Sequence, residues 1–300
     1  MSATTTAATA ATTGASPGRS AVVLALGRTL RTWRGGLSLL CLLAVVAAAL
    51  LAPWVAPYAY DAQNLQATNQ APTLAHWLGT DEFGRDVLSR IIVGARTSLA
   101  VAATAIGVSV LVGMSLGAAA GYFGGLFDRV VTAVVDLTWS FPEVLIALMF
   151  VALMGAGLQA TMVAIAIAYL AQFARLTRAQ VMGIKNETYV EAAVNLGAGH
   201  WHIVFRHLLP NAITPVIVAG MLAVGDAIIL EATLGFFGLG VQPPQPSWGA
   251  MMSSGTAQIF LAPWTILGPG LAIALTVVSI NLFGDALIEA LDIRNRLRET

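Results

Sequence analysis

Four carboxylates stand within otherwise apolar segments of this 300-residue sequence: Asp136, Glu143, Asp226 and Glu231. A carboxylate inside a membrane costs a few kcal/mol, so such residues are candidates for a substrate pathway or a proton relay. Asp136 and Glu143 are seven residues apart with Ser140 between them, and one continuous helix would place all three on a single polar face. Asp226 and Glu231 are five apart, so both cannot face one pore equally.

We take these five residues as candidates for a translocation pathway. Asp226 is expected on the pathway or at a subunit interface, and Glu231 in an ordered cap region at the outer end of its helix. The alternative is that the carboxylates accept hydrogen bonds from backbone, serine or threonine groups and only fix helix packing.

A second candidate region is the loop at 187–210, whose pattern predicts two short helices. Thr188 and Glu191 have capping-box spacing, which would start the first helix, and Gly197 suits its C-terminal cap. Pro210 would end the second helix and begin the next membrane span. One face of the second helix is apolar and contains Trp201, Val204, Phe205 and Leu208. Such an amphipathic hairpin needs a groove on a partner protein, or lipid headgroups, to cover that face.

The composition indicates a membrane protein that crosses the bilayer several times. Hydrophobic residues make up 57% of the chain and charged residues only 10%, and the mean hydropathy is +0.79; a soluble domain carries about 25% charge. The 15 basic and 15 acidic residues balance, which argues against nucleic-acid binding. The single cysteine, Cys41, excludes an intrachain disulfide framework and a cysteine-based metal site.

Six segments have roughly the 20 apolar residues that a membrane helix needs. They are 36–56, 97–122, 130–154, 159–176, 212–234 and 264–287. Because backbone groups in lipid must be satisfied within the segment, these spans predict an all-α, polytopic membrane fold. With six spans, 12 basic residues fall on the side of the termini and 3 on the other, so both termini are expected in the cytoplasm.

The spans divide the chain into three predicted parts. These are a disordered cytoplasmic tail at 1–30, a first membrane helix with a long outer loop at 31–96, and a core domain at 97–298 that contains the loop at 187–210. The alternative that the N-terminal region is a cleaved signal peptide is disfavoured, because its apolar run is too long.

Small residues recur every four positions on the second predicted span. Ser109, Gly113, Gly117 and Gly121 form this stripe, which would let another helix approach closely. We expect a role in helix packing rather than as a gating hinge.

Four ordered segments resemble one family of transporter subunits. Glu191-Ala192-Ala193, then Gly197, then Leu209-Pro210 resembles the EAA loop of permease subunits of binding-protein-dependent ABC importers. Three more segments are similar to the dipeptide/oligopeptide/nickel permeases: LGTDEFGRDVLSR at 78–90, LEATLGFFGLGVQPP at 230–244 with PSWG after it, and NLFGDAL at 281–287 with LD after it. The similarity covers roughly 30–298 and is specific to the "C"-type subunit; His207 stands where many permeases have isoleucine.

The resemblance implies the type I ABC importer permease fold, with a cytoplasmic coupling hairpin that docks in a groove of an ATPase. The residues that it assigns to ATPase coupling are Glu191, Ala192, Ala193, Gly197, Trp201, Phe205, Arg206, Leu209 and Pro210. It implies a multi-pass subunit of the bacterial cytoplasmic (inner) membrane, surrounded by lipid. The implied partners are a homologous second permease, two cytoplasmic ATPase subunits or one fused ATPase, and an extracytoplasmic substrate-binding protein.

No catalytic residue, cofactor or metal is expected in this chain. It has no G-x-x-x-x-G-K-[ST] motif, and its only lysine, Lys185, follows Ile184, so ATP and Mg²⁺ are expected on the partner ATPase. His200, His202 and His207 fit a coupling interface better than a metal cluster. The cargo stays open among dipeptides, oligopeptides, nickel chelates, glutathione and haem-like molecules.

Two other functions compete with this interpretation. A secondary transporter driven by an ion gradient could use the four carboxylates for proton coupling, but it would leave the hairpin without a role. A membrane scaffold or sensor would need a soluble domain to receive or send a signal, and the sequence has none attached.

Overall fold

The computed structural model describes residues 26–299, and every regular element in this part of the chain is a helix. Within it, the only strand-like pairing is an isolated bridge between Thr80 and Asp86. Most of the predicted disordered tail at 1–30 lies outside the described residues. Residues 26–31 are helical, so the prediction is wrong for the last part of that tail.

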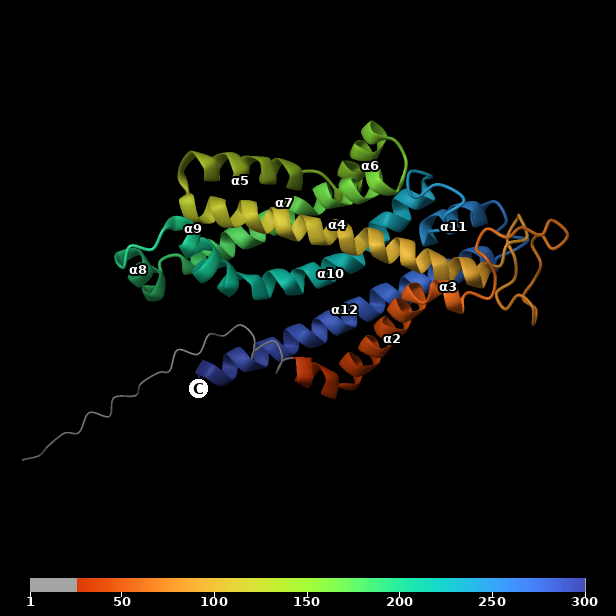
Figure 1. Cartoon of the computed structure of the whole chain (residues 1–300), viewed down its shortest axis with the longest axis horizontal. Coiled ribbons are helices and arrows are strands. Elements are labelled where there is room, and N and C mark those ends of the chain that lie inside the picture. Colours follow the sequence, from red (N-terminus) through yellow and green to blue (C-terminus); the bar gives the residue numbers. More distant parts are fainter. Residues whose placement is uncertain (1–25, 300) are drawn as a thin grey trace, which may run out of the picture.

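Long helices run lengthwise through the molecule, with loops gathered at one end and a helical hairpin at the other (Figure 1). The helices are α2 (Trp33–Leu50), α3 (Ala52–Val55), α4 (Val87–Phe123), α5 (Gly125–Trp139), α6 (Glu143–Met154), α7 (Leu158–Ile184), α8 (Thr188–Asn195), α9 (His200–His202), the π-helix η1 (Ile203–Leu208), α10 (Leu209–Phe236), α11 (Trp248–Thr256) and α12 (Trp264–Glu299). We call the end formed by residues 56–86 and 237–263 the cap end, and the end formed by residues 185–208 the hairpin end.

The number of membrane spans agrees with the prediction, but one span is broken. Five helices in the described residues are long and apolar enough to cross a membrane, and the pair α5 and α6 makes a sixth if it counts as one span. This pair bends by 97°, so the predicted continuous helix at 130–154 is wrong. Pro142 explains the break, because it has no N–H to donate and disfavours helical backbone at the residue before it.

The small-residue stripe of α4 faces α7 along most of the contact between the two helices. The hydroxyl of Ser109 donates to the Ala166 carbonyl at 2.7 Å. A Cβ added at Gly117 would lie 2.2 Å from the carbonyl oxygen of Ala174. The two backbones are therefore nearly in contact, and the stripe joins α4 and α7 into one packed unit.

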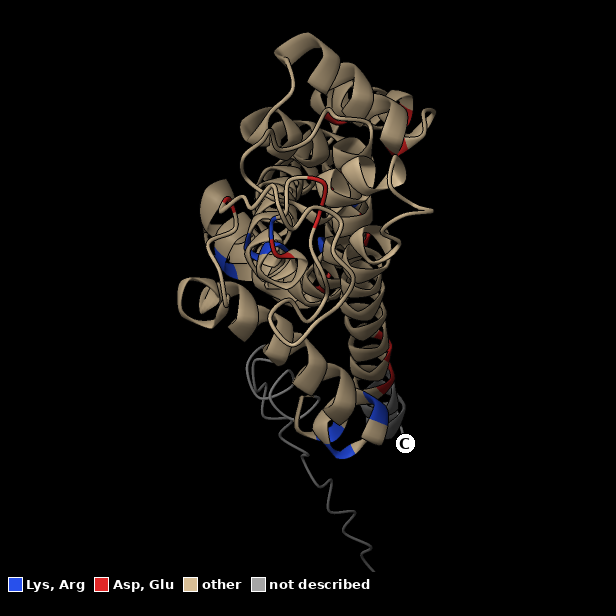
Figure 2. Cartoon of the chain, turned by 90° about the vertical axis from the view of Figure 1, so that its right-hand side faces the viewer, with Lys and Arg blue, Asp and Glu red and all other residues tan. Residues whose placement is uncertain are grey.

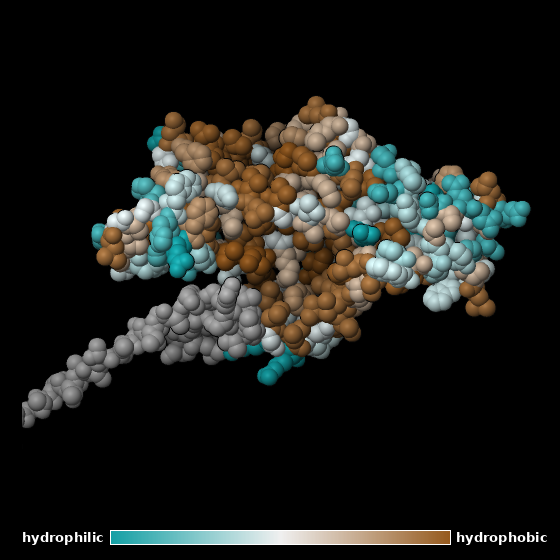
Figure 3. Space-filling model, viewed as in Figure 1, coloured by the Kyte–Doolittle hydropathy of each residue, from teal (hydrophilic) through white to brown (hydrophobic). Residues whose placement is uncertain are grey.

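Apolar residues cover the middle of the molecule, and hydrophilic residues gather toward its two ends, on the face shown in Figure 3. This distribution matches a protein whose middle lies in lipid and whose cap and hairpin ends lie in water. The hairpin end and the cap end are thus on opposite sides of the membrane.

Candidate functional site

The hairpin at 187–210 begins with α8, which ends in a glycine-based cap. Gly197 has a φ of +80°. The Gly197 N–H donates to Val194 O at 2.9 Å, and the Ala198 N–H donates to Ala193 O at 3.1 Å. This pair of bonds is a Schellman motif, in which a β-carbon would strain the left-handed residue. No atom lies within 4 Å of an added Cβ at Gly197, so its backbone conformation alone favours glycine there.

The predicted capping box at the start of this helix is wrong. Glu187 is the N-cap residue, with extended backbone, and no side chain caps the helix. Thr188 is the first helical residue, so its hydroxyl is one position too late to cap. Glu191 therefore takes no part in capping the helix, and its side chain is exposed.

The second arm of the hairpin runs into the next membrane helix without a break. Residues His200–Phe236 form one continuous helical stretch. Pro210 lies in the first turn of α10, and the Leu209 N–H donates to Val204 O, five residues back, in the wider turn of η1. A π-turn makes room for a proline that would otherwise clash with the carbonyl four residues before it. The prediction that Pro210 ends the second helix of the hairpin is therefore wrong.

The four residues of the predicted apolar face of this arm do not lie on one face: two are buried and two are exposed. Val204 and Leu208 are buried against α4 and α7, together with Val190 of α8. Trp201 and Phe205 are 63% and 61% exposed, and their rings stack with centroids 5.9 Å apart. The buried residues hold the hairpin to the bundle, and the exposed aromatic pair is left for a partner.

Most of the residues assigned to coupling share this exposed surface. The exposed ones are Glu191, Ala192, Gly197, Trp201, Phe205, Arg206 and Pro210. Ala193 is buried and Leu209 is half-buried, so these two support the hairpin from inside. Leu196, which the sequence analysis did not single out, is the most exposed apolar residue of the hairpin, at 88%.

Polar contacts tie the hairpin to the helices beneath it. Lys185 donates from Nζ to Gly121 O at 3.1 Å, and the Tyr122 hydroxyl lies 2.9 Å from Nδ1 of His200. Asn211 donates to the hydroxyl of Tyr189 and so joins the two arms. Burial raises the pKa of the Tyr189 hydroxyl above its ordinary value.

The bend between α5 and α6 separates the pathway candidates that the sequence placed on one helix. Ser140 lies at the end of α5, where its hydroxyl donates to Asp136 O, and Glu143 starts α6 in a new direction. The predicted polar stripe on one helix is therefore wrong. Asp136 instead lines a small hollow beside Arg175 and Arg178 of α7.

Glu143 and Asp226 are exposed on neighbouring helices, and each lies within electrostatic range of Tyr169 on α7. Glu143 and Asp226 also interact with each other across α6 and α10. These two carboxylates lay 83 positions apart in the sequence, and only the packing of the bundle brings them together.

Glu231 is fully buried inside the fold, near the cap end of α10. Ser98 of α4 and Ser247, the N-cap of α11, are its polar neighbours. The carboxylate is closed off from any open surface of the chain. Its place near the cap agrees with the expected cap region and not with the wall of an open pathway.

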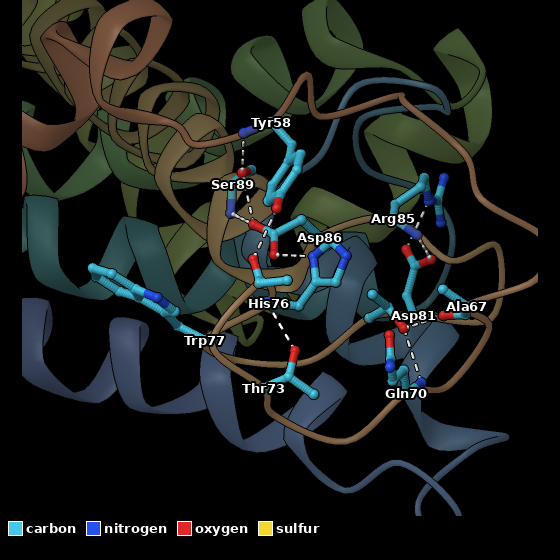
Figure 4. Close-up of polar contacts among 12 residues, drawn as sticks. Tyr58, Ala67, Gln70, Thr73, His76, Trp77, Asp81, Arg85, Asp86 and Ser89 are labelled. Carbon is cyan, nitrogen blue, oxygen red and sulfur yellow. Dashed lines mark hydrogen bonds and ion pairs between the residues drawn. The ribbon is translucent and has the colours of Figure 1, made fainter.

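A polar network lies at the cap end, within and around the segment 78–90 that resembles the permeases (Figure 4); the sequence pattern did not predict these contacts. Asp86 caps α4, since its carboxylate accepts from the N–H and the hydroxyl of Ser89 at 2.8 and 2.7 Å and also contacts His76 at 2.9 Å. Asp81 binds the Arg85 guanidinium at 2.7 Å. The spacing of Asp86 and Ser89 is a helix-start signal that could have located the cap.

Comparison with known proteins gives the family of this chain. Residues 110–297 match the family described as binding-protein-dependent transport system inner membrane component. Residues 25–72 match the N-terminal TM domain of oligopeptide transport permease C. The chain is 42% identical over 256 residues to the glutathione transport system permease protein GsiD of Pectobacterium atrosepticum, which covers 84% of each chain.

Two further similarities concern a second relative and a solved structure. The dipeptide transport system permease protein DppC of Alkalihalophilus pseudofirmus is 41% identical over 244 residues, or 81% of this chain and 80% of that protein. A chain of the inward-facing MetNI methionine ABC transporter has the same fold, with a TM-score of 0.55 and 20% identity over 68% of this chain and 96% of that one. The predicted all-helical, polytopic fold is confirmed. This chain belongs to the family of binding-protein-dependent transport system inner membrane components, the permease subunits of ABC importers.

Proposed function

We propose that this permease forms half of a translocation pathway for small peptides, a class that includes dipeptides, oligopeptides and glutathione. The named cargo of its relatives supports this choice, because the similarity to a glutathione permease and to a dipeptide permease extends over more than four fifths of the chain. ATP hydrolysis by partner subunits would drive the import.

The observation that carries the proposal is the exposed apolar surface of the hairpin. Trp201, Phe205 and Leu196 present large apolar side chains at an end of the molecule that lies in water. Such a surface on a rigid, anchored hairpin fits a groove on a protein. In an ABC importer permease that protein is the cytoplasmic ATPase, which holds the ATP and Mg²⁺.

The hairpin end would then lie in the cytoplasm of a bacterium and the cap end outside its inner membrane. The excess of basic residues on the side of the hairpin supports this orientation. The start of α2 and the end of α12 both lie toward the hairpin end (Figure 1), as both termini in the cytoplasm require. A second permease would complete the pathway, and an extracytoplasmic binding protein would deliver cargo to the cap end.

Glu143 and Asp226 would face the pathway where the two permeases meet. Both are exposed in the chain by itself, although they lie on membrane helices, so either a partner or an aqueous path must surround them. Two carboxylates there would favour the ammonium group of a peptide over an anion. Asp136 and Ser140 would lie on the neighbouring arm of the same broken span.

Purification from the native membrane tests this proposal. We expect the tagged chain, gently solubilised, to bring a second permease and a P-loop ATPase with it. With the binding protein supplied, we expect the assembly to import a labelled tripeptide into liposomes only with ATP. Recovery of the chain alone, with uptake driven by an ion gradient, would instead establish a secondary transporter.

A further inference from the structure

A cavity of about 600 Å³ opens at the cap end, apart from the hairpin and from Glu143 and Asp226. Three parts of the chain form it: the loop before α4 with the first turn of that helix, the end of α10 with the turn after it, and α11. Figure 2 looks onto this end and shows acidic and basic segments close together near its middle. The cavity therefore lies at the surface that would meet arriving cargo.

Two buried arginines make one wall of the cavity, and Asp81 holds both of them. Arg85 contacts Oδ2 of Asp81 at 2.7 Å and Arg90 contacts the same oxygen at 3.4 Å. Arg90 also donates to the carbonyl of Tyr60 at 3.0 Å. The Arg85 guanidinium lies over the ring of Phe83, 4.5 Å from its centroid. This wall is thus built and rigid before any ligand arrives.

Glu82 lines the cavity with a carboxylate whose hydrogen-bonding capacity is mostly unsatisfied. Its Oε1 forms only a long contact of 3.4 Å with Nη2 of Arg85, and its Oε2 is buried without a hydrogen-bond partner. A buried carboxylate oxygen without a donor is unfavourable, and a terminal carboxylate rotates easily. The Glu82 carboxylate can therefore turn to a cationic donor in the cavity, which would free Nη2 of Arg85 for an anion while its Nε stays on Asp81.

We infer that this cavity is an outer binding site for a short zwitterionic peptide, in which Glu82 takes the ammonium end and Arg85 the carboxylate end. The inference rests on the proposed import of peptides. It adds a site on the outer face of this chain where the cargo binds before it enters the pathway. A ligand with both charges gives Glu82 a new cationic partner and Arg85 a new anionic partner in place of their weak contact with each other. An ion of one sign gives a new partner to only one of the two.

The rest of the lining suits the body of a peptide. The side chains of Gln63, Gln245 and Ser253 offer amide and hydroxyl groups for peptide bonds, and Val241 and Pro243 offer apolar contact. The volume lies within the range of about 300–1,000 Å³ that is usual for small-molecule sites. Gly235 of α10 also lines the cavity, so the site stands at the outer end of the helix that carries Asp226.

Binding of trialanine and N-acetyl-trialanine to the assembled permeases in nanodiscs, without binding protein, tests the inference. We expect the wild type to bind free trialanine at least tenfold more tightly than the acetylated form. Glu82→Gln is expected to bind both peptides with the weaker affinity, since its amide cannot pair with an ammonium. Glu289→Gln is the matched control, because Glu289 is exposed on α12 and does not line the cavity; it should bind as the wild type does.

A second variant covers the case in which Glu82→Gln does not assemble. Ser254→Trp would fill the cavity from its exposed rim and should abolish binding of trialanine. A wild-type preference for free amine that persists in Glu82→Gln, or undiminished binding in Ser254→Trp, would overturn the inference. So would a Glu82→Gln variant that loses only the docking of the binding protein, because the occupant would then be a basic side chain of that protein.

Uptake by the complete wild-type complex separates this inference from the proposed function. If ATP-driven uptake of trialanine is absent, the proposed peptide import is wrong. If uptake is normal but the binding experiment fails, only the outer site is wrong.

Discussion

Replacing Gly117 with alanine should destabilise the contact between α4 and α7 more than the same change at Gly113 or Gly121. The added Cβ would lie 2.2 Å from Ala174 O, and 3.0 Å from both Ala174 C and Arg178 N. These atoms are all backbone, so no side-chain rotation can relieve the overlap, and the two helices must move apart by about 1 Å.

The magnitude follows from this geometry. Overpacking a close contact costs about 1–3 kcal/mol, and we expect the top of this range because the obstacle is backbone. A loss of about 3 kcal/mol corresponds to a fall in Tm of roughly 6–12 °C for a protein of this size. Gly113→Ala should cost less, because its Cβ would lie 2.8 Å from Leu170 O.

Thermal unfolding of the purified assembly in detergent measures the effect, and the same helix supplies a control. Gly107 of α4 is exposed, and an added Cβ there would meet no atom within 4 Å. Gly107→Ala should leave the Tm unchanged or raise it, since alanine is favoured over glycine in a helix by about 0.5–1 kcal/mol. Equal Tm values for Gly117→Ala and Gly107→Ala would refute the reasoning.

Three further predictions concern the hairpin and the carboxylates. Gly197→Ala should destabilise the α8 cap by about 1 kcal/mol, measured as faster hydrogen exchange in the hairpin, because its φ is +80°; Gly199→Ala, at a φ of −67°, should not. Trp201→Ala should lower the Tm only slightly, since it removes one edge contact with Phe123, but should weaken the ATPase partner's affinity at least tenfold, since most of the ring is exposed at the proposed interface; unchanged affinity would remove this residue from the interface. Asp226→Asn should lower ATP-driven uptake of cationic peptides more than Asp136→Asn does, and unchanged uptake and substrate range would exclude Asp226 from the pathway.

Spacing and composition were sufficient for those features that depend on one helix at a time. The apolar runs located the membrane spans, and the four-residue recurrence of Ser109, Gly113, Gly117 and Gly121 identified a face that α7 does contact. A glycine stripe predicts a close approach whatever the partner helix is, so no tertiary information was needed. The same reasoning placed Gly197 at the end of α8.

Features that depend on how two elements meet could not be predicted in this way. Pro142 was visible in the sequence, but the apolar run around it was long enough for one span, and the bend of 97° depends on packing. Pro210 was assigned as a helix end because the sequence does not reveal the π-turn that accommodates it. The proximity of Glu143 to Asp226 follows from that same bend, which turns α6 away from Asp136.

The position of the stripe gives the Gly117 variant a second expected effect. At the cap end, Asp86 fixes the first turn of α4, and at the hairpin end the Lys185–Gly121 and Tyr122–His200 contacts fix the last turn to the hairpin. The α4–α7 contact lies between these two anchors, so it is one route by which a movement of the hairpin can reach the cap, beside the continuous helix that α10 forms with the hairpin. Gly117→Ala should therefore also lower peptide-stimulated ATPase activity relative to basal activity, whereas Gly107→Ala should preserve their ratio. A stable Gly117→Ala assembly with normal stimulation would show that α4 and α7 do not carry the coupling.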